Sequence, residues 1–89
     1  MIKENKQTVL LTGGLGLLGK AVAHDLNKRG FHVIVVDIHA SSEGLDENID
    51  YISFDLCKID QYFRLKEEIK KKTQNLTCLI NNAAYNPKV

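Results

Sequence analysis

The chain has 89 residues, enough for one domain with a thin hydrophobic core. Hydrophobic residues make up 44% of it and charged residues 26%, with one proline, so the composition is that of a globular domain and excludes disordered and fibrous classes. The formal net charge of +1 gives no basis for attraction to nucleic acid or to a membrane surface.

The first half of the chain alternates between strand and helix patterns. A short apolar run predicts a strand over Thr8–Leu11, which stops at a glycine-rich turn. Apolar residues at three- and four-residue intervals predict a helix over about Leu17–Lys28, ended by Gly30. The run Val33–Val36, which ends at Asp37, is apolar on both faces, as in the interior of a parallel sheet. The apolar stripe of the predicted helix consists of Leu15, Leu18, Val22 and Leu26.

The second half repeats this alternation after a polar surface loop over Ser41–Asn48. The patterns predict a third strand over Tyr51–Phe54, a helix over about Ile59–Lys72 and a fourth strand over Thr77–Ile80. The apolar positions of that helix are Ile59, Tyr62, Phe63, Leu65 and Ile69. The whole series predicts an α/β fold: a partial doubly wound parallel sheet of the Rossmann type, strand order 3-2-1-4, with helices on both faces.

The turn between the first strand and the first helix reads Thr12-Gly13-Gly14-Leu15-Gly16-Leu17-Leu18-Gly19. Such a string inside a βαβ unit indicates a dinucleotide site. We expect Gly13 to permit the tight turn, Gly16 to admit a pyrophosphate to the backbone amides, and Gly19 to let the helix approach the sheet. The helix N-terminus then favours the negative charge of the phosphates.

Asp37 supplies the acidic partner that this turn requires. It follows Gly19 by eighteen residues and ends the second predicted strand, where a carboxylate binds the adenosine ribose. At ~4 Å and an effective dielectric of about 20, it would repel a 2′-phosphate by roughly 4 kcal/mol. No Arg or Lys stands at position 14, 38 or 39 to offset that repulsion. The sequence therefore predicts NAD rather than NADP as the cofactor.

The glycine turn, Asp37, the pair Asp55-Leu56 and the segment Asn81-Asn82-Ala83-Ala84 together resemble the N-terminal half of a short-chain dehydrogenase/reductase. The resemblance implies that Asp55 and Leu56 contact the adenine, and that Asn82 to Ala84 pass beside the adenosine and steady the sheet. It also implies that residues 1–89 are the N-terminal part of a single NAD-binding Rossmann domain that lacks its catalytic half. The full set of predicted cofactor-binding residues is Gly13, Gly14, Leu15, Gly16, Leu17, Leu18, Gly19, Asp37, Ile38, Asp55, Leu56, Asn82, Ala83 and Ala84.

Two motifs of this resemblance indicate different branches of the family. The spacing Thr-Gly-x-x-Gly-x-x-Gly is usual in the extended branch that acts on nucleotide sugars, whereas Asn-Asn-Ala-Ala is usual in the compact branch. The last segment is also similar to members in surface-polysaccharide or flagellin-glycan synthesis. The expected function is an NAD-dependent oxidoreductase, present as its cofactor-binding fragment. The alternatives are a fragment of an NAD-dependent epimerase or dehydratase, or a nucleotide-binding module without catalysis.

No catalytic residue is predicted. The pair Tyr62 and Lys66 has the family's Tyr-x-x-x-Lys spacing, but it precedes the Asn-Asn-Ala segment instead of following it, and Tyr62 falls on an apolar helix stripe that predicts a core position. An alcohol, carbonyl or sugar substrate is expected only with the C-terminal half present. His24, His32 and His39 share no spacing for a metal or a nucleophile–base pair and are expected to be partly exposed.

The remaining features concern the cell compartment and the sheet edge. Cys57 and Cys78 match no disulfide or zinc pattern and are interpreted as buried reduced thiols. The first residues lack the apolar core of a signal peptide, and no apolar run approaches the ~20 residues of a membrane helix, which predicts a cytoplasmic protein without a membrane partner. Without a fifth strand, Thr77–Ile80 would be an unpaired edge, so we expect marginal stability or self-association.

Overall fold

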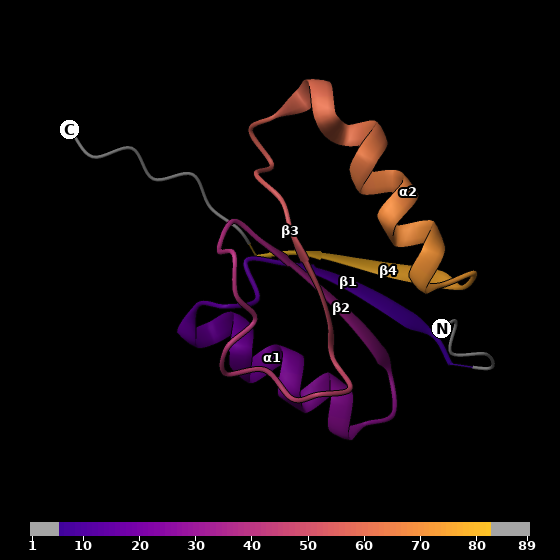
Figure 1. Cartoon of the computed structure of the whole chain (residues 1–89). Helices are drawn as coiled ribbons and strands as arrows, with labels where there is room; N and C mark the ends of the chain where they lie inside the picture. Colours follow the sequence, from indigo (N-terminus) through magenta and orange to yellow (C-terminus); the bar gives the residue numbers. More distant parts are fainter. Residues whose placement is uncertain (1–5, 83–89) are drawn as a thin grey trace.

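The computed structural model describes residues 6–82, which form four parallel strands, two α-helices and one 3-10 turn (Figure 1). The elements in chain order are β1 (Thr8–Thr12), α1 (Leu17–Lys28), β2 (His32–Asp37), β3 (Asp50–Ser53), the 3-10 turn (Ile59–Gln61), α2 (Tyr62–Lys72) and β4 (Leu76–Asn81). Every predicted strand and helix is present, with ends within about one residue except at α2, whose first predicted residues form the 3-10 turn.

The strand order is β3-β2-β1-β4 with all neighbours parallel, which confirms the predicted topology. Val9 of β1 pairs with Val33 of β2, and Leu11 pairs with Val35. All of β1 and most of β2 are buried, because helices cover the sheet on both faces (Figure 1). The backbone amide of Phe54, just beyond β3, still bonds the Asp37 carbonyl oxygen at 2.8 Å, which continues the pairing predicted for that residue.

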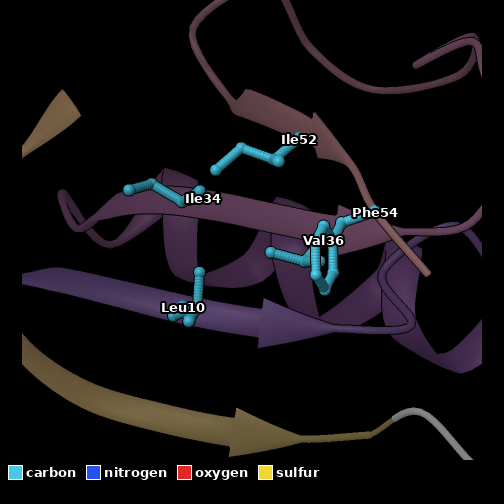
Figure 2. Close-up of a cluster of buried hydrophobic side chains, with 5 residues drawn as sticks. All are labelled: Leu10, Ile34, Val36, Ile52 and Phe54. Atoms are coloured by element: carbon cyan, nitrogen blue, oxygen red, sulfur yellow. The ribbon is translucent and has the colours of Figure 1, made fainter. Parts of the chain in front are cut away.

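Alternate residues of the strands build two separate cores. Figure 2 shows the buried side chains of one of them. Leu65 and Ile69 of α2 pack against this core, which therefore lies on the α2 side of the sheet. Its buried members are Leu10, Ile34, Val36, Ile52 and Phe54. The core on the α1 side consists of Leu11, Ala23, Val33, Val35 and Ile49, with Val22 and Leu26 packed against it. This division confirms that the second strand is apolar on both faces because both faces are covered.

Several apolar residues of the predicted helices and both cysteines are exposed. Leu18 is 68% exposed because it lies in the first turn of α1, beside the glycine turn and not over the strands. Phe63 is 74% exposed, since Leu65 and Ile69 occupy the side of α2 that faces the sheet; Ile59 of the 3-10 turn is exposed as well. The interpretation of Cys57 and Cys78 as buried thiols is wrong. Both are free and exposed, one in the loop after β3 and the other on the uncovered edge strand β4.

His32 is buried, contrary to the expectation of partial exposure. Its Nε2 lies 2.5 Å from a carboxylate oxygen of Asp50, and its Nδ1 lies 3.2 Å from the hydroxyl of Thr8. That hydroxyl is 2.6 Å from the hydroxyl of Thr73, which accepts the backbone amide of Asn75 at 3.0 Å. This series of hydrogen-bonded polar side chains joins the amino ends of β3, β2 and β1 to the end of α2.

The predicted surface loop Ser41–Asn48 lies against α1. The Nδ1 atom of His24 is 3.0 Å from a carboxylate oxygen of Asp46, and the side-chain amide of Asn27 donates to the Asn48 side chain at 3.0 Å. Both helix residues are partly exposed. Helix–loop hydrogen bonds therefore fix the course of the chain between β2 and β3.

Candidate functional site

A groove of about 700 Å³ lies at the carboxyl ends of the strands. Ligands of open α/β sheets bind at this edge, because the loops that follow the strands meet there. The groove is lined by Gly13, Gly16, Val36, Asp37, Ile38, His39, Phe54, Asp55, Leu56, Cys57, Tyr62, Asn81 and Asn82. It therefore brings together residues from all four described strand ends.

The glycine turn presents backbone donors to this groove. The amide of Gly13 bonds the Val36 carbonyl oxygen at 2.8 Å, which continues the β1–β2 pairing by one residue, and the φ of 70° at Gly13 then turns the chain away from the strand. The first helical hydrogen bond runs from the amide of Lys20 to Gly16 at 2.8 Å, so the amides of residues 17–19 precede the ladder and have no intrahelical acceptor. Within residues 6–82, α1 has no side-chain cap at Gly16 and no acidic residue in its first turn. This end of α1 therefore favours an anion.

The four glycines of the turn have different physical roles. A Cβ at Gly16 would meet only the Gly13 carbonyl oxygen, at 3.7 Å, so that position opens onto the groove. A Cβ at Gly19 would lie 2.2 Å from the same oxygen and 2.8 Å from the Cα of Gly14. A Cβ at Gly14 would lie 2.5 Å from a methyl group of Val35. Gly13 and Gly16 thus face the groove, while Gly14 and Gly19 let the turn close.

Asp37 lies at the end of β2, with its side chain 13% exposed. One carboxylate oxygen accepts the amide of Leu15 at 3.1 Å, and the other accepts the amide of Ile38 at 2.7 Å. Each oxygen has a further acceptor site, so the carboxylate can still bind hydroxyl groups in the groove. The Nε2 atom of His39 lies 4.0 Å away. Asp37 therefore couples the glycine turn to the β2 end of the groove.

The loop after β3 forms the opposite wall. Asp55 accepts the amide of Cys57 on its side-chain oxygen at 2.9 Å, and the Leu56 carbonyl accepts the hydroxyl of Tyr62 at 2.6 Å. The rings of Phe54 and Tyr62 pack with centroids 5.7 Å apart. This wall therefore combines a carboxylate with apolar surface, which suits the polar edge and the flat face of a heterocyclic base.

The end of β4 braces the glycine turn from the other side. The side-chain amide of Asn82 donates to the Gly13 carbonyl oxygen at 3.0 Å, and its backbone amide donates to the Thr12 hydroxyl at 3.1 Å. That hydroxyl donates in turn to the side-chain oxygen of Asn81 at 2.9 Å. Ala83 and Ala84, which were predicted to line the site, lie outside the described residues.

Seven of the twelve predicted residues that the structure describes line the groove, and six further residues line it as well. The five predicted residues that do not line it are Gly14, Leu15, Leu17, Leu18 and Gly19. Leu17 is 96% exposed, and Leu18 is also exposed; neither side chain lines the groove. The lining residues that were not predicted are Val36, His39, Phe54, Cys57, Tyr62 and Asn81. Most of these are direct neighbours of predicted residues at strand ends, which is the signal that could have identified them. Tyr62 was missed because its helical spacing indicated a core position, whereas it is 44% exposed.

Of the pair with Tyr-x-x-x-Lys spacing, Tyr62 lines this groove and Lys66 does not. The Tyr62 hydroxyl donates to the Leu56 carbonyl, and Lys66 lines a second, apolar groove between α2 and β4. Within residues 6–82, no three His, Cys, Asp or Glu side chains are grouped so that they could hold a metal ion. The same residues contain no helix long and apolar enough to span a membrane. The backbone amides, carboxylates and apolar side chains at the groove fit the recognition of an anion, hydroxyl groups and a heterocyclic base.

A parallel sheet of order 3-2-1-4, a glycine turn at a helix N-terminus and a carboxylate ending the second strand define a Rossmann-type fold. The model of the short chain dehydrogenase family matches residues 7–89. The chain belongs to this family of oxidoreductases.

Individual relatives agree with that membership. The chain is 35% identical over 85 residues to short-chain dehydrogenase/reductase family 42E member 1 of Macaca fascicularis, with 93% of this chain and 20% of the relative covered. It is 34% identical over 86 residues to 3-oxoacyl-(acyl-carrier-protein) reductase FabG of Buchnera aphidicola, with 89% and 34% covered. The fold is similar to the crystal structure of L-threonine dehydrogenase from Clostridium difficile, with a TM-score of 0.67, 17% identity, and 91% of this chain and 25% of that chain covered. The chain thus spans between a fifth and about a third of these relatives.

Proposed function

We propose that residues 1–89 are the cofactor-binding N-terminal part of a Rossmann domain in an NAD-dependent oxidoreductase. The observation that carries this proposal is the joint geometry of the glycine turn and Asp37, whose carboxylate accepts the Leu15 amide at 3.1 Å and faces the groove. Family membership supports the same assignment. The described residues that line the groove fit the recognition of a dinucleotide.

The residues around the groove fit such a cofactor. The amides at the start of α1 and the open position at Gly16 would hold the pyrophosphate. Asp37 would bind the adenosine ribose, with Ile38 beside it, and the wall formed by Asp55 and Leu56 would receive the adenine. Asn82 would keep the turn in place through Gly13. A bound nicotinamide cofactor supplies hydride transfer, for which this part of the chain provides position and electrostatics.

NAD is proposed over NADP because Asp37 places a negative charge where a 2′-phosphate would lie. The variant Asp37→Asn keeps the size of the side chain and removes its charge. We expect it to lower the preference for NAD over NADP by at least about tenfold, since like charges near 4 Å repel by up to roughly 4 kcal/mol at an effective dielectric of 20. Calorimetric titration of the unaltered chain and of Asp37→Asn with NAD and with NADP measures the ratio of the two dissociation constants.

The effect of Asp37→Asn is also measured in a chain that carries His39→Ala. The His39 ring lies 4.0 Å from the Asp37 carboxylate and could itself contact a 2′-phosphate. A thermal melt of each variant shows whether the turn survives loss of the Asp37 charge. Equal binding of NAD and NADP by the unaltered chain would contradict the proposed cofactor. Failure to bind either one would contradict the proposed site.

The catalytic step and the substrate belong, in this proposal, to sequence beyond residues 1–89. An alcohol, carbonyl or sugar substrate would be bound by that sequence, and the chain alone is expected to bind cofactor without turning substrate over. The glycine spacing still favours the extended branch and the Asn-Asn-Ala-Ala segment the compact branch. A cytoplasmic location remains part of the proposal.

We also propose that this chain associates with itself through β4. Within the described sheet, β4 is an edge strand that carries no charged residue, and it exposes Leu79 at 61% and Leu76 at 45%. Such an edge is a template for pairing with another strand. We expect Leu79→Lys to shift the chain towards monomer, as measured by light scattering across a concentration series. Phe63→Lys on α2 is the matched control. If both lysine variants shift the chain towards monomer equally, association through β4 is contradicted.

A further inference from the structure

Two tyrosine hydroxyls contact backbone carbonyl groups of the nucleotide groove's walls: Tyr51 does not line the groove, whereas Tyr62 does. The hydroxyl of Tyr51 in β3 donates to the carbonyl oxygen of His39, and the carbonyl oxygen of Asp37 lies 3.2 Å from the same hydroxyl. Tyr62 of α2 donates to the carbonyl oxygen of Leu56 at 2.6 Å. One phenol therefore holds the segment after β2, and the other holds the loop after β3.

Tyr51 is suited to this role because its hydroxyl stays a donor. Burial, and then the negative charge of Asp37, raise the pKa of the Tyr51 phenol above its ordinary value, against the smaller opposite effect of a hydrogen bond with Ser53. The two carbonyl groups that it faces flank Ile38, which lines the groove. A single side chain on the outer strand thus fixes three consecutive residues at the ribose end of the groove.

Tyr62 contacts the opposite wall, which is formed by the loop after β3, and it also lies between the two grooves. Its ring is tilted by 54° against Phe54, with centroids 5.7 Å apart. The same side chain lines the nucleotide groove and the apolar groove of about 670 Å³ that runs past Leu65 and Ile69. The hydrogen bond from the Tyr62 hydroxyl to the Leu56 carbonyl oxygen therefore fixes the position, relative to α2, of the wall formed by Asp55 and Leu56.

We infer that Tyr51 and Tyr62 are positioning residues that set the separation of the two walls to the width of an adenosine group. The inference rests on the proposed function. It gives the Tyr62 hydroxyl a role in nucleotide recognition in place of the proton transfer that its spacing to Lys66 suggests. Neither hydroxyl is required for the pyrophosphate end of the groove, which is built from the turn at Gly13 and Gly16.

The variants Tyr51→Phe and Tyr62→Phe test this, because each removes one hydroxyl and keeps the ring. Titration by NMR uses adenosine and inorganic pyrophosphate as separate probes of the two ends of the groove. We expect each variant to bind adenosine about three- to tenfold more weakly, which is the range for loss of one hydrogen bond. The affinity for pyrophosphate should not change. Tyr51→Phe should also narrow the preference for NAD over NADP, because the Asp37 backbone loses its tether.

The control is Phe63→Leu, a neighbouring residue of α2 whose side chain is exposed and does not line the groove. If the unaltered chain binds neither probe, the proposed function fails. If it binds both and the tyrosine variants bind adenosine equally well, or lose adenosine and pyrophosphate to the same extent, the positioning role fails. If Tyr51→Phe does not fold, Tyr62→Phe, at a more exposed residue, still tests the positioning role at the wall formed by Asp55 and Leu56.

Discussion

Replacing Gly19 by alanine is expected to destabilise the chain by about 3 kcal/mol and to abolish dinucleotide binding. The added methyl group would lie 2.2 Å from the Gly13 carbonyl oxygen and 2.8 Å from the Cα of Gly14. Both are backbone atoms, so relief requires the turn to move away from α1. A chain of this length has a stability of about 4 to 13 kcal/mol, so the loss is a large fraction of the total.

The matched control is Gly16→Ala, which adds the same methyl group three residues earlier. Its nearest neighbour would be the Gly13 oxygen at 3.7 Å, an ordinary contact, so the fold should melt close to the unaltered temperature. Binding should still fall, because that methyl group points into the space proposed for the pyrophosphate. Denaturant unfolding and cofactor titration of both variants separate the two effects. Unchanged stability of Gly19→Ala would contradict the close approach seen at this turn.

The topology could be predicted from the sequence because each strand carries its own signal. Val33–Val36 has no polar residue, which requires cover on both faces, and the glycine turn after β1 specifies a strand-to-helix connection. The burial of individual helix residues could not be predicted in the same way. Leu18 and Phe63 fit a helical period, but only tertiary packing decides that α1 begins beside the turn and that Leu65 and Ile69 face the sheet.

The candidate site was predictable where a motif describes backbone geometry and was incomplete elsewhere. Gly13, Gly16 and Asp37 meet in the groove because their spacing fixes one turn and one strand end. The contributions of Tyr51 and Tyr62 depend on hydroxyl groups that reach across from another element to carbonyl oxygens. Short-range sequence patterns carry no information about such contacts. The same limit explains why His32 was expected at the surface.

His32 occupies the centre of a buried polar chain whose hydrogen bonds can all be satisfied in one direction. The Asn75 amide donates to the hydroxyl of Thr73, which can donate to the hydroxyl of Thr8, and that hydroxyl can donate to Nδ1 of His32. The remaining ring proton on Nε2 then faces the Asp50 carboxylate at 2.5 Å. This arrangement ties the edge strand β3, both central strands and the segment before β4 together at the end of the sheet opposite the groove.

Replacing His32 by phenylalanine should therefore destabilise the fold by about 2 to 4 kcal/mol, because it leaves a buried hydroxyl without its acceptor and a carboxylate without its donor. Thr8→Val removes the hydroxyl that lies between Thr73 and His32 in this series of hydrogen bonds, with little change in side-chain volume. The double variant should be less destabilised than the sum of the two single variants by about 1 kcal/mol, as residues of one network are coupled. His39→Phe, an exposed histidine, should change the free energy of unfolding by less than about 0.5 kcal/mol. Strict additivity of His32→Phe and Thr8→Val in denaturant unfolding would show that the two side chains stabilise the sheet independently.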